Sequence, residues 1–172
     1  MKAAKYLRQK QIVFLPDKNL GAYVRAEVPE KEFILWNGFC PVHDGVTEED
    51  LLRAKSEHPN ARVLVHPECT PEIQQSSDFV GSTSGIINNV MGTHEHEYVI
   101  GTEIGVTERL REVLPEKSVY PLSYGMVCVN MKKIGLEDIK KSLENNTFEV
   151  EVPNGVLVRA RASLEKMMEA CG

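Results

Sequence analysis

The sequence predicts an α/β protein with small parallel sheets, in which one structural unit is duplicated. Short apolar runs alternate with helix-like segments along most of the chain, which is the pattern of parallel sheets covered by helices. A unit of strand, helix, strand and cysteine also occurs twice. With 172 residues, of which 42% are hydrophobic and 26% charged, the chain has the composition of a folded globular protein.

The predicted strands are four or five residues long and rich in Val, Ile and Phe: residues 12–15, 32–36, 61–65, 78–81, 97–101 and 119–122. Helices are expected over 47–58, opened by Thr47, and over 107–114, opened by Thr107. Two more helices are expected over 135–146 and 154–172. The apolar positions of the last helix predict a core face: Val158, Ala162, Leu164 and Met168.

The repeated unit ends at Cys40 in its first copy and at Cys128 in its second. Each copy has an apolar strand, a loop with an acid and a glycine, a helix, a Pro-Glu-Lys triplet and a second strand. If each copy is a right-handed crossover, its cysteine follows the carboxyl end of a parallel strand, where α/β sheets bind ligands. Both cysteines are then expected to face one cleft. A chance likeness between two α/β segments is the alternative.

The repeat suggests domains over 11–90 and 91–172. The net charge of -5 argues against a nucleic-acid or anionic-membrane partner. No apolar run approaches the roughly 18–20 residues of a membrane span, and residues 1–10 lack the apolar core of a signal peptide. We therefore expect a cytoplasmic protein that binds small molecules and whose cysteines are thiols or metal ligands.

Two strand ends carry metal-ligand chemistry. Cys40 and His43 follow one strand, and His66, Glu68 and Cys69 follow the next. Thiolates and imidazoles suit iron and zinc. One interpretation is a closed structural zinc site of Cys40, His43, His66 and Cys69. Another is that the histidines are hydrogen-bonded structural residues.

A third candidate site lies over residues 81–85, Gly-Ser-Thr-Ser-Gly, where a strand runs into a helix. Free backbone N–H groups at such a helix start, together with the hydroxyls of Ser82 and Thr83, bind carboxylate or phosphate. An ordinary helix cap is the simpler interpretation. A metal-free domain that binds a small anion at this loop is therefore a further functional alternative.

Several segments together resemble the quinolinate synthase family: PDKNLG (16–21), WNGFCPVH (36–43), VLVHPEC (63–69), DFVGSTSGI (78–86), IGTEIG (100–105) and CVNMKK (128–133). The resemblance implies three homologous three-layer αβα sandwiches with small parallel sheets around a pseudo-threefold axis, each giving one cysteine to a central 4Fe-4S cluster. Two of these sandwiches, related by pseudo-symmetry, are expected in this chain, where Cys40 and Cys128 match the second and third ligands. The first domain, with the remaining ligand, is expected to be missing here and to be the intramolecular partner of this chain, and residues 1–10 resemble its last helix.

The resemblance also implies a transferase of NAD biosynthesis, in which iminoaspartate and dihydroxyacetone phosphate condense to quinolinate and one open iron acts as a Lewis acid. His66 and Glu68 would bind substrate and transfer protons, and His43 would lie at the edge of the cluster. Ser82 and Thr83 would hold a carboxylate or the phosphate. Cys69 and Cys171 match no ligand and are expected to be structural thiols. With two cluster cysteines, the isolated chain is expected to be cluster-free and inactive.

Overall fold

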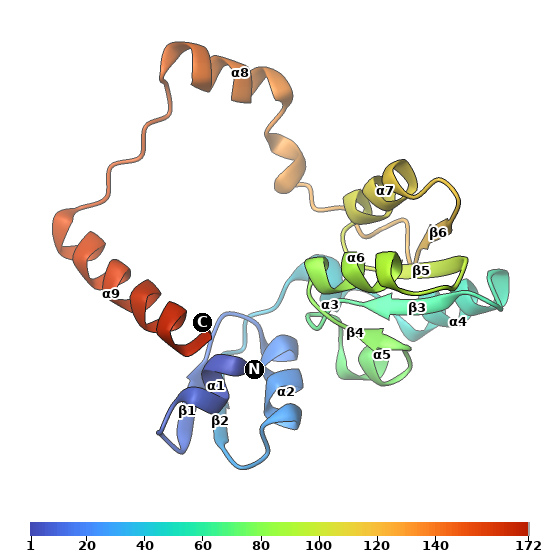
Figure 1. The fold of residues 1–172 in the computed structure, drawn as a ribbon, viewed down its shortest axis with the longest axis horizontal. Helices are drawn as coiled ribbons and strands as arrows, with labels where there is room; N and C mark the ends of the chain where they lie inside the picture. Colours follow the sequence, from blue (N-terminus) through green and yellow to red (C-terminus); the bar gives the residue numbers. More distant parts are fainter. Residues whose placement is uncertain (172) are drawn as a thin grey trace. The chain divides into compact units, whose positions relative to one another are not determined.

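The computed structural model describes residues 1–171, and for Cys171 it describes the backbone (Figure 1). The chain forms two compact units, one over residues 11–128 and one that combines residues 1–10 with the segment from residue 129 onward. All strands of the described residues lie in the first unit. The predicted α/β class is confirmed.

Six short strands form two parallel sheets. The first sheet pairs β1 (Gln11–Phe14) with β2 (Glu32–Leu35). The second has the order β4-β3-β5-β6 and contains β3 (Arg62–Val65), β4 (Phe79–Val80), β5 (Glu97–Gly101) and β6 (Ser118–Pro121). All six strands agree with the predicted runs to within a residue or two. Strand β3 pairs with β5, so the second sheet extends across the boundary predicted at residue 90. The domain boundaries expected from the sequence stay a prediction.

The first unit contains six helices among the described residues: α2 (Lys18–Glu27), α3 (Pro41–Asp44), α4 (Glu48–Glu57), α5 (Pro71–Gln75), α6 (Thr83–Gly92) and α7 (Ile104–Val113). The prediction that Thr47 opens α4 is confirmed, since its hydroxyl accepts from the backbone N–H of Asp50. The prediction that Thr107 opens α7 is wrong. That helix begins three residues earlier, with Glu103 as its N-cap, and Thr107 is fully buried inside it.

The four-stranded sheet is the middle of three layers, because each of its faces carries a separate apolar cluster. Side chains alternate along β3, so that Val63 and Val65 face one cluster while Leu64 faces the other. The first cluster includes residues of α4 and α5, and the second includes residues of α6 and α7, as Figure 1 shows for the two sides of the sheet. This arrangement confirms the predicted αβα sandwich.

The two-stranded sheet packs against α2 at very close range. A Cβ atom at Gly21 would lie 2.7 Å from Leu35 and 2.9 Å from Phe14, so glycine lets the helix approach the sheet. The N-terminus of α2 follows β1 directly, through Pro16 and the capping residue Asp17. The order of β1, α2, β2 and Cys40 thus matches the order of β5, α7, β6 and Cys128.

The second unit contains α1 (Lys2–Tyr6), a short 3-10 helix η1 (Met131–Lys133), α8 (Leu136–Asn145) and α9 (Asn154–Cys171), and α1 packs against α9. The predicted core face of the last helix is wrong for this structure, because Val158, Ala162, Leu164 and Met168 are all exposed. None of the described helices combines the length and apolar character needed to cross a membrane.

Candidate active site and metal-binding group

The carboxyl ends of neighbouring strands bring the predicted site residues to one edge of the four-stranded sheet. His66 follows β3, and its backbone N–H donates to the carbonyl of Gly101 at the end of β5 over 2.9 Å. The loop that begins at Gly81 follows β4 beside it, with its N–H 3.1 Å from the Val65 carbonyl. The position matches the general rule that open parallel sheets bind ligands at this edge.

Asn19 ties the two-stranded sheet to this edge. Its buried side-chain amide donates to Asp44 Oδ1 over 2.8 Å and to the backbone carbonyl of Glu68 over 3.0 Å. Asp44 ends the short helix α3, which Cys40 opens and which contains His43. Asn19 therefore holds the Cys40 loop and the His66 loop in a fixed relation.

Each copy of the repeated unit uses a buried carboxylate in the same way. Asp17 caps α2 by accepting from two backbone N–H groups, and its other oxygen accepts from the N–H of Cys40 over 2.9 Å. Glu103 caps α7 by accepting from Gly105, and its other oxygen accepts from the N–H of Cys128 over 3.3 Å. One acid thus fixes both a helix start and a cysteine in each copy. This shared geometry supports the duplication read from the sequence.

His43 lies between these parts and is almost fully buried, with 8% of its surface exposed. Its Nε2 lies 3.0 Å from Thr102 Oγ1, and its Nδ1 lies 3.1 Å from Glu68 Oε2. The Glu68 oxygen is nevertheless poorly aligned with the ring nitrogen, so that Nδ1 has no well-formed hydrogen bond. The ring of His43 stacks on that of His66 with centroids 4.6 Å apart.

Burial dominates the protonation equilibria of the site. Burial and, to a smaller extent, the neighbouring His66 together lower the pKa of His43 to about 4, although Asp17 and Glu103 oppose the shift. Burial also lowers the pKa of His66, and it raises the pKa of Glu68, an effect that Asp17 reinforces. Both imidazoles are therefore neutral at pH 7, and the Glu68 carboxyl is shifted toward the range useful for proton transfer.

His66 is oriented by its own loop. The backbone N–H of Glu68 donates to His66 Nδ1 over 3.3 Å, so the ring proton is placed on Nε2. Oε2 of Glu68 lies 3.8 Å from the same Nδ1. A neutral donor at Nε2 and a carboxylate thus come from one turn after β3, a combination that can bind and protonate an oxygen-bearing substrate.

Cys40, His43 and Glu68 offer ligand atoms that all lie within 4.8 Å of one another. Cys128 is outside this group, although its thiol is also free and half-buried. Fe–S clusters are held by Cys thiolates. Cys40 and Cys128 are free, half-buried thiols, and the backbone amide of each donates to a buried carboxylate. Their chemistry is compatible with two of the cluster ligands.

Cys69 does not belong to a metal site. Its thiol is fully buried and donates a weak hydrogen bond to the Gly101 carbonyl over 3.5 Å, and burial raises its pKa to about 12. Among the described residues, the group whose ligand atoms lie within 4.8 Å of one another is Cys40, His43 and Glu68, and it includes neither Cys69 nor His66. The closed zinc site of Cys40, His43, His66 and Cys69 is thus not assembled, and the expectation of a structural thiol at Cys69 is supported. The side chain of Cys171, the other expected structural thiol, lies outside the described residues.

Ser82 and Thr83 lie at the start of α6, as the sequence predicts. Ser82 is the N-cap, and its hydroxyl accepts from the N–H of Gly85 over 3.2 Å. Both residues are exposed. The hydroxyl proton of Ser82 and the free N–H groups of the first turn stay available to an anion.

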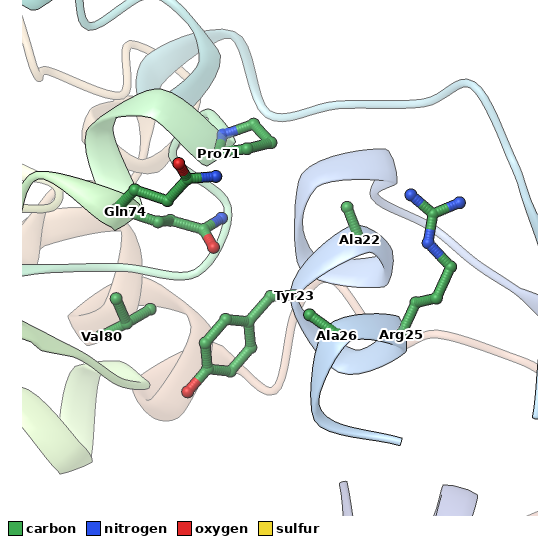
Figure 2. Close-up of a pocket in the computed structure, with 8 residues that line it drawn as sticks. Ala22, Tyr23, Arg25, Ala26, Pro71, Gln74 and Val80 are labelled. Atoms are coloured by element: carbon green, nitrogen blue, oxygen red, sulfur yellow. The ribbon is translucent and has the colours of Figure 1, made fainter. Parts of the chain in front are cut away.

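A separate groove of about 410 Å³ lies between α2 and α5 (Figure 2). None of the predicted site residues lines it; the lining residues are Ala22, Tyr23, Arg25, Ala26, Pro71, Gln74, Gln75 and Val80. Burial raises the pKa of Tyr23, and Glu27 adds to the effect, so the phenol is neutral at pH 7. The titratable groups with the chemistry of a catalytic site are those beside His43.

A family profile decides the assignment. The profile described as "Quinolinate synthetase A protein" matches residues 1–169. The chain belongs to the quinolinate synthetase A family. Its resemblance to quinolinate synthases, expected from the motifs, is thereby confirmed.

Relatives named quinolinate synthase agree with this family assignment. The protein of Caldicellulosiruptor bescii is 48% identical over 159 residues, which cover 92% of this chain and 52% of the relative. The protein of Clostridium kluyveri is 45% identical over 168 residues, covering 98% and 55%. That of Thermodesulfovibrio yellowstonii is 43% identical over 157 residues, covering 91% and 52%. The chain thus spans about half the length of these quinolinate synthases.

Three positioning residues of this family member were not predicted as site residues: Asp17, Thr102 and Glu103. The sequence carries a signal for the two acids, since each lies between an apolar strand and a helix in equivalent loops. Thr102 gives no comparable signal, because its contact with His43 joins residues that are 59 positions apart.

Proposed function

We propose that this chain carries the second and third cluster ligands and the proton-transfer residues of a quinolinate synthase. In this proposal the enzyme condenses iminoaspartate with dihydroxyacetone phosphate to quinolinate, in NAD biosynthesis in the cytoplasm. The observation that carries the proposal is the convergence of Cys40, His43 and Glu68 at the edge where Asp17 and Glu103 fix the two repeated cysteines. The family match supplies the class of reaction.

Cys40 and Cys128 would each give one thiolate to a 4Fe-4S cluster, and the third would come from outside these 172 residues. When bound, the cluster supplies a Lewis-acidic iron. The charges of Asp17 and Glu103 both raise the pKa of His43, so both carboxylates lie near its ring. This supports convergence of the two cysteines. Each of these acids is bonded to one of the two cysteines.

Glu68 would act as the acid and base that moves protons during the condensation. Its pKa is raised by burial, which brings the carboxyl nearer to the operating pH. His66 would donate a hydrogen bond from Nε2 to a substrate oxygen, since its Nδ1 is occupied by the backbone of Glu68. His43 would stay neutral and limit the access of water beside Cys40.

Ser82 and Thr83 would bind a substrate carboxylate or the phosphate at the start of α6. The helix has ten residues, so its N-terminus carries the partial positive charge of a full dipole. The loop follows β4, next to the strand that carries His66 and Glu68. An anion held here would lie on the same sheet edge as the acid and base.

We further propose that the isolated 172 residues are inactive, because two thiolates leave a cluster exposed and weakly held. A chimera tests the function directly. The segment of the Caldicellulosiruptor bescii protein that aligns with this chain is replaced by this chain, and the chimera is reconstituted anaerobically with iron and sulfide. Quinolinate formation from dihydroxyacetone phosphate and freshly generated iminoaspartate is measured by mass spectrometry, beside the parent enzyme.

The expected result is quinolinate formation by the chimera, and loss of at least about 100-fold on Glu68→Gln with the cluster content unchanged. Cys40→Ser and Cys128→Ser should each remove the cluster absorbance as well as the activity. The isolated chain should form no quinolinate. A folded, cluster-loaded chimera without activity would contradict the proposal, as would full activity of the Glu68→Gln variant.

A further inference from the structure

The group formed by Cys40, His43 and Glu68 has the composition of a site for a single metal ion. It combines a thiol, an imidazole and a carboxylate, with all ligand atoms within 4.8 Å of one another. In a tetrahedral site with metal-ligand bonds of about 2.0–2.3 Å, ligand atoms lie roughly 3.3–3.7 Å apart. The 3.1 Å between His43 Nδ1 and Glu68 Oε2 is close to this separation. Small side-chain rotations are sufficient to bring the three ligands around one ion.

The buried Nδ1 atom of His43 is the second observation that points to a cation. This atom has no well-aligned hydrogen-bond partner, although only 8% of the surface of His43 is exposed. In the tautomer that donates from Nε2 to Thr102 Oγ1, Nδ1 presents a lone pair toward the Glu68 carboxylate. Two lone pairs that face each other at this distance repel, and a cation between them removes the repulsion.

We propose that Cys40, His43 and Glu68 bind one thiophilic divalent cation, Zn²⁺ or Fe²⁺, through Sγ, Nδ1 and Oε2. Thr102 is the outer partner that fixes the ring, as metal-bound histidines generally require on their second nitrogen. Three protein ligands leave the fourth tetrahedral position open to water or another small ligand. The donor set favours zinc or iron over magnesium and calcium, which prefer oxygen alone.

This site shares Cys40 with the proposed cluster and excludes Cys128. The single ion and the cluster are therefore alternative occupants of one thiolate, and loading with zinc blocks cluster assembly. The inference depends on the geometry of three side chains and holds whether or not the chain acts in quinolinate synthesis. Its test is chosen so that the two proposals fail separately.

The test is anaerobic titration of the metal-free chain with Co²⁺, a spectroscopic substitute for zinc. The expected result is one equivalent of Co²⁺ per chain, with a sulfur-to-cobalt charge-transfer band and the intense visible bands of tetrahedral cobalt, both displaced by Zn²⁺. Cys40→Ser should remove the charge-transfer band. Glu68→Gln and Thr102→Val should each weaken binding by about tenfold or more. Far-ultraviolet circular dichroism checks that each variant is folded.

Cys128→Ser is the matched control, because a cluster needs both cysteines whereas the single ion needs Cys40 alone. This variant should bind Co²⁺ with an affinity within about twofold of the unmodified chain, as expected for a residue outside the site. Equal loss of Co²⁺ affinity in Cys40→Ser and Cys128→Ser would overturn the inference. The absence of cobalt uptake would overturn it as well, and would mean that a proton is shared between His43 and Glu68. X-ray absorption of the zinc-loaded chain needs no variant and should show one sulfur neighbour per zinc; two would contradict the site.

Discussion

Asp17 is the residue whose replacement tests the duplicated architecture most sharply. Its carboxylate is 3% exposed and accepts from the backbone N–H groups of Asn19, Leu20 and Cys40 over 2.8, 2.9 and 2.9 Å. In Asp17→Asn, one oxygen can still cap the helix, but an NH₂ group replaces the oxygen that faces Cys40. A hydrogen bond to a charged acceptor is lost and a donor is left facing a donor. We expect a loss of about 2–3 kcal/mol in the free energy of unfolding.

The equivalent change in the second copy should cost less. Glu103 Oε1 accepts from the N–H of Cys128 over 3.3 Å, which is longer than the 2.9 Å between Asp17 and Cys40, and Oε2 caps α7 by accepting from the N–H of Gly105 over 2.8 Å. We expect about 1 kcal/mol for Glu103→Gln. Urea unfolding followed by circular dichroism measures both values, with the exposed Glu48→Gln as a surface control that should change stability by less than about 0.5 kcal/mol.

The rate of cysteine alkylation separates this account from general destabilisation. Asp17→Asn should speed iodoacetamide labelling of Cys40 while leaving Cys128 unchanged, and Glu103→Gln should do the reverse. Labelling is quantified by peptide mass spectrometry under conditions where each variant stays folded. A cost of less than about 0.5 kcal/mol for Asp17→Asn would contradict the shared role of the two acids, as would variants that each change both cysteines alike.

Three further predictions follow from burial and close contact. Because the pKa of His43 falls from 6.5 to about 4 on folding, the metal-free chain should lose stability as the pH drops from about 6.5 to 4. The loss should be at most about 3 kcal/mol, reduced by solvent screening, and urea melts at each pH should show a flatter dependence for His43→Gln. Cys69, fully buried and with a pKa of about 12, should resist alkylation in the native chain at pH 8, while Cys40 and Cys128 react; labelling of Cys69 at their rate would contradict its burial. Gly38→Ala should cost about 1–3 kcal/mol in urea melts, since the added Cβ meets the carbonyl oxygen of Pro16 in the backbone, which cannot move as a side chain can; an unchanged melt would contradict this contact.

The strands and the class of fold could be predicted because they depend on local pattern. Residues 63–65 are apolar at every position, as strands covered by helices on both sides must be, and they lie in β3. The start of α7 was predicted wrongly because Thr107 resembles a helix cap. The true cap is Glu103, whose longer side chain accepts a hydrogen bond from the backbone N–H of Gly105. A helix start with two possible caps is decided by tertiary contacts.

The site was predictable by residue type but not by partner. The sequence placed Cys40, His43, His66 and Glu68 after strands, and the structure brings His43 and Glu68 into contact. It could not show that Cys69 turns into the core while Glu68 turns to the site, because neighbouring side chains after a strand differ only by the local turn. The exposed apolar face of α9 shows the same limit, since a helical pattern identifies an apolar face without identifying what covers it.

The convergence of Cys40 and Cys128 on one centre is tested most directly by a short thiol cross-linker in the metal-free chain. Dibromobimane fluoresces once both of its arms have reacted, and a Cys171→Ser background removes the remaining terminal thiol. We expect one fluorescent bridge per folded chain, with Cys40 and Cys128 in the same cross-linked peptide, and its loss on replacing either cysteine with serine. Separate single alkylation of the two cysteines, with no bridged product, would contradict it.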